Sequence, residues 1–343
     1  MADPSELVPC TTSDGLSLAL RRIRPRGAHP RGPLIMQHGL GSNGFIFDCP
    51  GRSLSTHLAS RGFDCYVAEL RGAGQSDRPK GPWGIDEYVE IDIPAILAAV
   101  KSASGAERVS WLGHSLGGIL GMFYAMEHPG GPIARLVAVA SALDYRPGRS
   151  SFRELRKLRW VAGDWMQFLP FGAIARLSAK IAGRGPALAP EKMNFRRSNV
   201  EAEILRAALA RGFAPIPIRL FDDLDTTFSE RGFSRKRGEI RYLDRARDLR
   251  VPTCLIAGAR DVQCSILAVE ATARLLVNAP EVQVSCFGKA FGQVDDYGHF
   301  DLVIGRRAER ETWPTILTFL EKAVADTSDA SAGDASAGRS TAS

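Results

Sequence analysis

The stretch Val109-Ser110-Trp111-Leu112-Gly113-His114-Ser115-Leu116-Gly117 decides the fold of this chain. Its first four residues predict a buried strand, and the residues from Gly118 to Glu127 predict a helix. A strand that turns at once into a helix puts the middle residue of Gly-x-Ser-x-Gly in a strained conformation, with its side chain projecting from the turn. Small residues two positions before and after it let the backbone pack that closely. The pattern therefore predicts an exposed nucleophile, Ser115, beside a helix N-terminus that favours developing negative charge.

Short apolar runs alternate with helical stretches on both sides of this motif. The predicted strands are 34–37, 65–68, 109–112, 136–140, 254–257 and 282–287, and the predicted helices are 53–61, 91–102, 118–127 and 266–277. This alternation predicts an α/β fold with a mostly parallel sheet and helices on both faces. Residues 6–11 and 16–23 flank Ser13-Asp14-Gly15, which predicts two antiparallel strands at one edge of the sheet.

The regular alternation stops near Tyr145 and resumes at Val251. Residues 145–250 contain 23 Lys and Arg against 12 Asp and Glu, whereas the remainder contains 21 against 26. We therefore expect a core of residues 1–145 and 251–322 with an inserted, basic helical cap, 146–250. The clearest predicted helices in the cap are 152–168 and 202–211. Residues 323–343 are rich in Ala, Ser, Asp and Gly, and we expect a disordered tail.

The composition of the 343 residues is that of a globular protein, with 45% apolar and 24% charged residues and a net charge of +6. There is no apolar run long enough to cross a bilayer and no pattern of a secretory signal. Six cysteines without a CxxC pair predict reduced thiols, so we expect a cytoplasmic protein. No zinc spacing, phosphate-loop lysine motif or dinucleotide fingerprint is present, and we expect no metal and no cofactor. The sequence says nothing about the oligomeric state.

A serine nucleophile requires a base, and the imidazole of that base requires a carboxylate. Of the six histidines, only His299 lies in a loop between the last predicted strand and the last helix. Asp261 is the first acidic residue after the strand that ends at Ala257, and Asp144, after the preceding strand, is its rival. The expected catalytic residues are therefore Ser115, Asp261 and His299, in the chain order nucleophile, acid, base that accompanies a Gly-x-Ser-x-Gly elbow.

The turn His38-Gly39-Leu40-Gly41 follows the strand 34–37. Its glycines let the backbone approach a substrate carbonyl closely. The backbone N–H groups of Leu40 and Leu116 are the predicted oxyanion-hole donors. We place His38, Gly39 and His114 among the substrate-binding residues because they flank these groups, although the His114 side chain is expected to point away from the nucleophile.

These motifs resemble the α/β-hydrolase superfamily over about residues 7–145 and 251–322. The similar residues are His38-Gly39, the run from Arg71 to Asp77, the turn from Gly113 to Gly117, Asp261 and His299. The resemblance implies an esterase- or lipase-like enzyme with the triad and oxyanion roles given above. The segment 299–307 with Trp313-Pro314 is also similar to polyester-synthase-like members. Those synthases usually carry a cysteine nucleophile, so Ser115 favours hydrolysis over polymerisation.

The expected reaction is hydrolysis of a carboxylic ester that has a hydrophobic acyl group, through an acyl-enzyme, on a small-molecule or lipid-like substrate. Trp165 and Phe168 belong to an apolar cluster early in the cap, which either forms the roof of an acyl pocket or packs the cap onto the core. The alternative is an acyltransferase or thioesterase acting on a carrier-bound or CoA acyl group. The basic cap is an ordinary solvated surface or contacts anionic substrates, an acidic carrier or anionic lipid; nucleic-acid binding is not expected.

Overall fold

The computed structural model describes residues 5–27, 29–151, 153 and 166–334. Its core is an eight-stranded sheet in the order β1-β2-β6-β3-β7-β8-β13-β14. The strands are β1 (Glu6–Val8), β2 (Leu20–Ile23), β3 (Pro33–Gln37), β6 (Asp64–Ala68), β7 (Val109–His114), β8 (Ile133–Val139), β13 (Thr253–Gly258) and β14 (Val282–Phe287). β1 and β2 are antiparallel to their neighbours, and the other pairs are parallel. The six predicted strands and the antiparallel edge are confirmed.

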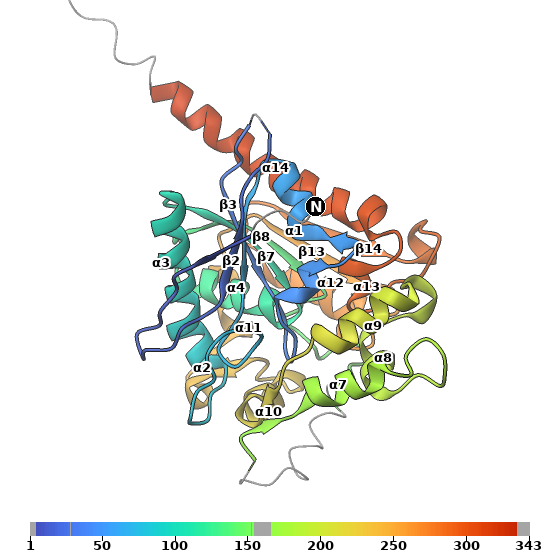
Figure 1. Ribbon diagram of the computed structural model, residues 1–343. Helices are drawn as coiled ribbons and strands as arrows, with labels where there is room; N and C mark the ends of the chain where they lie inside the picture. Colours follow the sequence, from blue (N-terminus) through green and yellow to red (C-terminus); the bar gives the residue numbers. More distant parts are fainter. Residues whose placement is uncertain (1–4, 28, 152, 154–165, 335–343) are drawn as a thin grey trace, which may run out of the picture.

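Helices cover both faces of the sheet (Figure 1). They are α1 (Leu54–Ser60), α3 (Ile93–Ser104), α4 (Leu116–Glu127), α12 (Ile266–Leu275), α13 (Asp301–Ile304) and α14 (Ala308–Asp334). One apolar cluster contains the buried side chains of α3, α4 and α12, among them Ile96 and Phe123. A second contains those of α1 and α14, among them Leu58 and Phe319. Burial of two apolar faces explains why the central strands carry apolar side chains without alternation.

The strand order places the end of β7 at the point where the sheet changes its direction of winding. From β3 the chain moves outward to β6 and then returns to β7 on the other side of β3. The loops that follow β3 and β7 therefore leave the sheet side by side at its carboxyl edge. Such a switch point is where open α/β sheets bind ligands.

The segment between β8 and β13 forms short helices and two small strand pairs, and its helices α7 to α10 gather at one end of the molecule (Figure 1). Its elements are β9 (Phe168–Leu169), α7 (Phe171–Ala179), α8 (Ala189–Asn194), α9 (Ala202–Arg211), β10 (Ile216–Pro217), α10 (Ile218–Asp225), β11 (Ser234–Arg235), β12 (Ile240–Arg241) and α11 (Tyr242–Arg245). α9 has the predicted bounds. Most of the predicted helix 152–168 lies outside the described residues, and Phe168 belongs to a strand. The strand pairs were not predicted.

We propose that residues 146–250 are a cap unit on a core of residues 1–145 and 251–322. We also keep residues 323–343 as a proposed tail; within the described residues, α14 extends to Asp334. Alanine has the highest helix propensity, and the alanines of this stretch follow an established helix. Residues 335–343 lie outside the described part. Within the described residues, none of the helices has the length and apolar character needed to cross a bilayer.

Candidate active site

Ser115 occupies the sharp turn between β7 and α4. Its φ of 53° and ψ of −123° lie in a region that side-chain-bearing residues rarely adopt. A Cβ atom on Gly113 would lie 2.2 Å from the Gly118 nitrogen, and one on Gly117 would lie 2.2 Å from the Gln37 oxygen. Glycine is therefore required on both sides of Ser115, and the predicted strand-to-helix elbow is present.

The loop after β3 packs directly against this elbow. A Cβ atom on Gly39 would lie 2.8 Å from the Ser115 Cβ and 3.4 Å from the Leu116 nitrogen. Among the described residues, the backbone N–H groups of Leu40 and Leu116 have no hydrogen-bond acceptor. Both residues line the same pocket as Ser115. Two unpaired donors beside one hydroxyl are what an oxyanion-stabilising site needs.

Asp261 and His299 meet although 37 residues separate them in the chain. Nδ1 of His299 donates to Oδ2 of Asp261 at 2.7 Å, and both side chains are buried. The other oxygen, Oδ1, accepts the N–H groups of Gln263 at 2.8 Å and Cys264 at 3.0 Å. These bonds fix the carboxylate, and they leave Nε2 as the ring nitrogen of His299 that is available for proton transfer.

The loop of His299 is joined to the residue before the nucleophile. Nε2 of His114 donates to the carbonyl oxygen of His299 at 3.0 Å, and the two rings lie edge to face with centroids 4.7 Å apart. No hydrogen bond joins the Ser115 hydroxyl to the His299 ring among the described residues. Such bonds are often long before a substrate is bound and shorten in the complex with substrate.

Asp144, the rival carboxylate, is engaged elsewhere. The Arg146 guanidinium donates to both of its oxygens at 2.8 Å, and this lowers the pKa of Asp144 below its usual range. The backbone N–H of Asp144 donates to the Thr272 hydroxyl at 3.2 Å. Of the two candidate acids, the structure brings only Asp261 to His299.

His38 and His114 are buried. Both ring nitrogens of His38 and Nε2 of His114 bind the backbone, whereas Nδ1 of His114 has no partner among the described residues. Nε2 of His38 accepts the N–H of Leu70 at 3.1 Å, and its Nδ1 donates to the carbonyl oxygen of Gly39 at 2.9 Å. Burial lowers the pKa of His38 to about 4 and that of His114 well below its usual range. Neither ring is among the residues that line the pocket of Ser115. Both shape the turns around the site and do not face the substrate space.

Ser115 opens into a small apolar pocket. Its lining comes from the core (Leu40, Ser115, Leu116, Ile119 and Tyr145) and from the cap (Leu224, Thr227, Phe228 and Phe233). Of the expected roof residues, Trp165 lies outside the described part, and Phe168 packs under the Arg78 guanidinium instead of lining this pocket. Sequence reasoning missed the four cap residues. The spacing of Ile218, Phe221, Leu224 and Phe228 along one helical face could have indicated two of them, Leu224 and Phe228.

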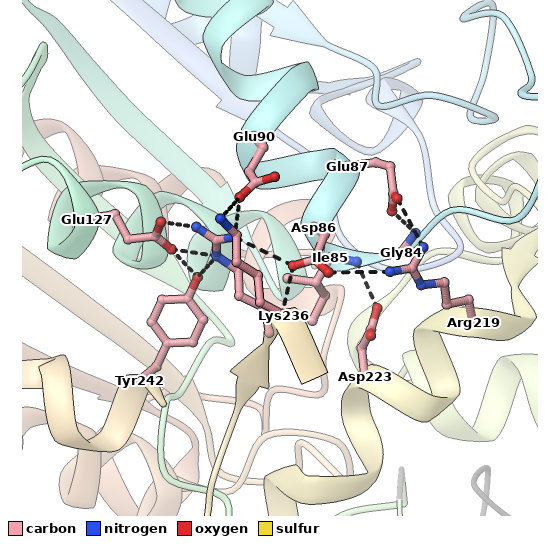
Figure 2. Close-up of polar contacts among 11 residues, drawn as sticks. Gly84, Ile85, Asp86, Glu87, Glu90, Glu127, Arg219, Asp223, Lys236 and Tyr242 are labelled. Atoms are coloured by element: carbon pink, nitrogen blue, oxygen red, sulfur yellow. Dashed lines mark hydrogen bonds and ion pairs between the residues drawn. The ribbon is translucent and has the colours of Figure 1, made fainter. Parts of the chain in front are cut away.

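The cap wall of this pocket is fixed to the core by a buried cation. The Arg235 side chain is 4% exposed, and it donates to Glu127 at the end of α4, to Glu90 at 2.6 Å and to the Tyr242 hydroxyl at 2.9 Å. Figure 2 shows Glu127 and Tyr242 on one side of this network and Glu90 with Lys236 on the other.

A second set of contacts extends the network toward α10. Arg219 binds Glu87 at 3.0 Å and Asp86 at 3.3 Å, and Asp223 accepts the N–H of Ile85 at 2.8 Å (Figure 2). These contacts fix both ends of the segment that carries Leu224, Thr227, Phe228 and Phe233. Across the described residues, no group of three side chains has the arrangement that a metal ion needs.

Comparison with known proteins agrees with this geometry. A profile described as "alpha/beta hydrolase fold" matches residues 32–303. The chain belongs to the α/β-hydrolase fold family. It is similar to Lipase member K of Mus musculus, with 24% identity over 94% of this chain and 89% of that protein. It is also similar to Lipase lipl-3 of Caenorhabditis elegans, with 29% identity over 52% of this chain.

The match to lipl-3 spans only 50% of that lipase's length. Among solved structures, the monoacylglycerol lipase of Paleococcus ferrophilus superposes with a TM-score of 0.63 at 20% identity, over 89% of this chain and 99% of that one. At this identity the superposition demonstrates the shared fold. The predicted resemblance and fold class are therefore confirmed.

Proposed function

We propose that this protein is a serine hydrolase that cleaves carboxylic esters with a hydrophobic acyl group. The observation that carries the proposal is the hydrogen bond of 2.7 Å from His299 to Asp261. His299 also contacts His114, the residue before Ser115 in the strained turn. A buried imidazole held by a carboxylate beside a strained serine is the arrangement that activates a hydroxyl. The similarity to lipases supports an ester as the substrate.

In the proposed mechanism the Ser115 oxygen attacks the ester carbonyl while Nε2 of His299 takes the hydroxyl proton. Asp261 holds the ring and stabilises its charged form. The N–H groups of Leu40 and Leu116 stabilise the oxyanion; one such donor typically contributes about a hundredfold to a thousandfold in rate. His299 then returns the proton to the departing alcohol, and water, activated by the same imidazole, releases the acid from Ser115.

The substrate proposed for this site is a small or lipid-like ester whose acyl chain enters the apolar pocket. The pocket walls offer Leu, Ile and Phe side chains, and among the described cap residues that line the pocket only Thr227 is polar. A cytoplasmic location completes the proposal, supported by six cysteines that are all free thiols.

A groove lined by arginines favours thioester cleavage or acyl transfer as a second candidate. Arg149, Arg153, Arg196 and Arg260 line an open groove beside Asp261. The Arg153 guanidinium lies 5.0 Å from the ring centroid of Phe228, which lines the apolar pocket, so groove and pocket are neighbours. Guanidinium groups bind phosphates well, as a CoA or carrier-bound acyl group or an anionic lipid surface would require.

The first experiment measures hydrolysis of p-nitrophenyl esters from acetate to palmitate by the wild type and by Ser115→Ala. We expect activity that depends on Ser115, with an optimum chain length that reflects the pocket, and fluorophosphonate labelling that is lost in Ser115→Ala. Labelling that survives this substitution would refute the assignment of the nucleophile.

The second candidate is tested with an acyl-CoA and the matched N-acetylcysteamine thioester, which lacks phosphates. Faster turnover of the CoA ester, reduced by Arg149→Ser and by added salt, would support it. Equal turnover of both thioesters would exclude a phosphate-recognising role for the groove. Salt-sensitive binding to phosphatidylserine vesicles, lost in the same variant, would assign the arginines to a lipid surface.

A further inference from the structure

A short segment of the cap reaches the two loops that carry Asp261 and His299. It is Met193-Asn194-Phe195-Arg196, which begins in the last turn of α8 and is called here the clip. The clip is far from the pocket wall formed by Leu224 to Phe233 in the sequence, and neither the proposed chemistry nor the acyl pocket uses it.

On the Asp261 side, the clip binds through Gln263. Nε2 of Gln263 donates to Oδ1 of Asn194 at 2.9 Å and to the carbonyl oxygen of Met193 at 3.0 Å. The backbone N–H of the same glutamine donates to Oδ1 of Asp261 at 2.8 Å. The glutamine thus joins the clip to the carboxylate that orients His299.

On the His299 side, the clip binds the two residues that follow the histidine, and one of them, Asp301, in turn binds Gly298. The N–H of Phe300 donates to the carbonyl oxygen of Asn194 at 2.9 Å. The N–H of Arg196 donates to the Asp301 carboxyl group at 3.0 and 3.2 Å, and the same group accepts the N–H of Gly298 at 2.9 Å. The loop cannot shift relative to the clip without breaking several of these bonds.

The clip contacts are shielded from water. Asn194 is 4% exposed, Gln263 is 5% exposed and Asp301 is fully buried. The Phe195 ring packs on Phe300, with centroids 5.4 Å apart. Because water cannot replace a lost partner at such sites, breaking one bond leaves a buried polar group unsatisfied.

We propose that the clip positions the Asp261–His299 pair, with Asn194 and Asp301 as positioning residues that act through Gln263 and through the backbone around His299. The inference rests on the proposed function. The cap then has two roles, because it forms the pocket wall and also holds the catalytic loops at the separation that the 2.7 Å bond needs. Misplacement by about 1 Å commonly costs about a hundredfold in rate.

The test compares Asn194→Leu, Gln263→Met and their double variant. We expect kcat on the best p-nitrophenyl ester to fall about tenfold to a hundredfold in each single variant, with KM and the preferred acyl length unchanged. Because the Asn194 side chain acts through Gln263, the double variant should be no slower than the slower single variant. Asp301→Leu should lose activity similarly. Asp301→Asn, which keeps an oxygen acceptor, should recover most of it.

Arg52→Met is the matched control. It removes another cap–core ion pair, to Glu201 at 2.5 Å, together with the Arg52 bonds to the carbonyl oxygens of Gly305 and Arg306. None of these bonds involves residues 258–264 or 297–301, so kcat should stay at the wild-type value. A merely structural role of the clip predicts equal losses in the control and in Asn194→Leu, with altered KM or chain-length preference. That result, or unchanged kcat in folded Asn194→Leu, would overturn the inference.

An NMR measurement that does not depend on catalytic activity separates this inference from the proposed function. The proton shared by His299 and Asp261 gives a low-field ¹H NMR resonance, assigned by its loss in Asp261→Asn. We expect it to be present in the wild type and in Arg52→Met and to weaken or shift in Asn194→Leu. If the wild type lacks esterase activity but the resonance behaves in this way, the function fails and the positioning role stands. An unchanged resonance in Asn194→Leu refutes the positioning role.

Discussion

Replacing Arg235 with methionine tests how the pocket wall is held in place. The substitution removes the cation from Glu127, whose side chain is 9% exposed, and leaves that carboxylate buried without its partner. Loss of one member of a buried ion pair typically costs about 3–5 kcal/mol of stability. The contact with Glu90 adds little, because the Glu90 carboxylate is 42% exposed and also binds Lys236. We therefore expect Arg235→Met to lower the free energy of unfolding by about 3–5 kcal/mol.

A double-mutant cycle with Glu127→Met isolates this interaction. Removing both charges leaves neither of them unpaired, so Arg235→Met/Glu127→Met should lose about 2 kcal/mol less than the sum of the single variants. Urea unfolding followed by tryptophan fluorescence gives the three free energies. Losses that add within about 0.5 kcal/mol would refute the reasoning.

The same variant has a predicted effect on substrate choice. Phe233 lies two residues before Arg235 and lines the pocket, so release of the cation should loosen that wall. We expect a broader acyl-length profile and a raised KM for the preferred ester, measured on the p-nitrophenyl series at a temperature where the variant is folded. An unchanged profile would mean that the wall keeps its position without the ion pair.

Four other substitutions give further tests. Asp261→Asn should reduce kcat by about 10⁴-fold, since the amide favours the wrong imidazole tautomer, while Asp144→Asn should leave kcat unchanged in the same assay. Gly39→Ala places a methyl group 2.8 Å from the Ser115 Cβ, so we expect it to abolish fluorophosphonate labelling and to cost about 1–3 kcal/mol in urea unfolding; normal labelling would contradict the close packing. Burial raises the pKa of Asp223 to about 6, so its protonation stabilises the folded state below pH about 4 and this contribution is lost as the pH rises to about 6. Asp223→Asn should therefore gain about 2 kcal/mol relative to the wild type between pH 4 and 7, and a constant difference between the two proteins across that range would disprove the effect.

The central fold could be predicted because its signals are local. Each buried parallel strand is a short apolar run, and the elbow at Ser115 requires glycines at fixed positions, so residues within a few places of one another determine the outcome. Asp261 and His299 were also predictable, because in this fold the loops after parallel strands meet at one edge. The structure was needed to exclude Asp144 as the partner of His299. The Arg146 guanidinium forms hydrogen bonds with both oxygens of Asp144, and no sequence motif predicts these bonds.

The cap could not be predicted to the same depth. Its strand pairs are two residues long, and its packing depends on contacts between distant segments, as between Arg235 and Glu127. The aromatic composition around Trp165 suggested a pocket roof there, whereas the pocket wall that the structure describes contains residues such as Leu224 and Thr227, which do not stand out in the sequence. Composition indicates which side chains are buried in the folded protein, but it does not indicate which residues they pack against.

The clip limits how freely caps can be exchanged between enzymes of this fold. A chimera that carries the present cap on another core would inherit Asn194 without the glutamine that binds its side chain and Arg196 without the aspartate that accepts its N–H, and the reverse graft would leave Gln263 and Asp301 facing an unrelated segment. Positions 194 and 263, whose side chains bind each other, should therefore change together during descent, although they are distant in the chain. A designer who wishes to alter acyl preference should replace residues 218–233 alone and keep 193–196 with the core.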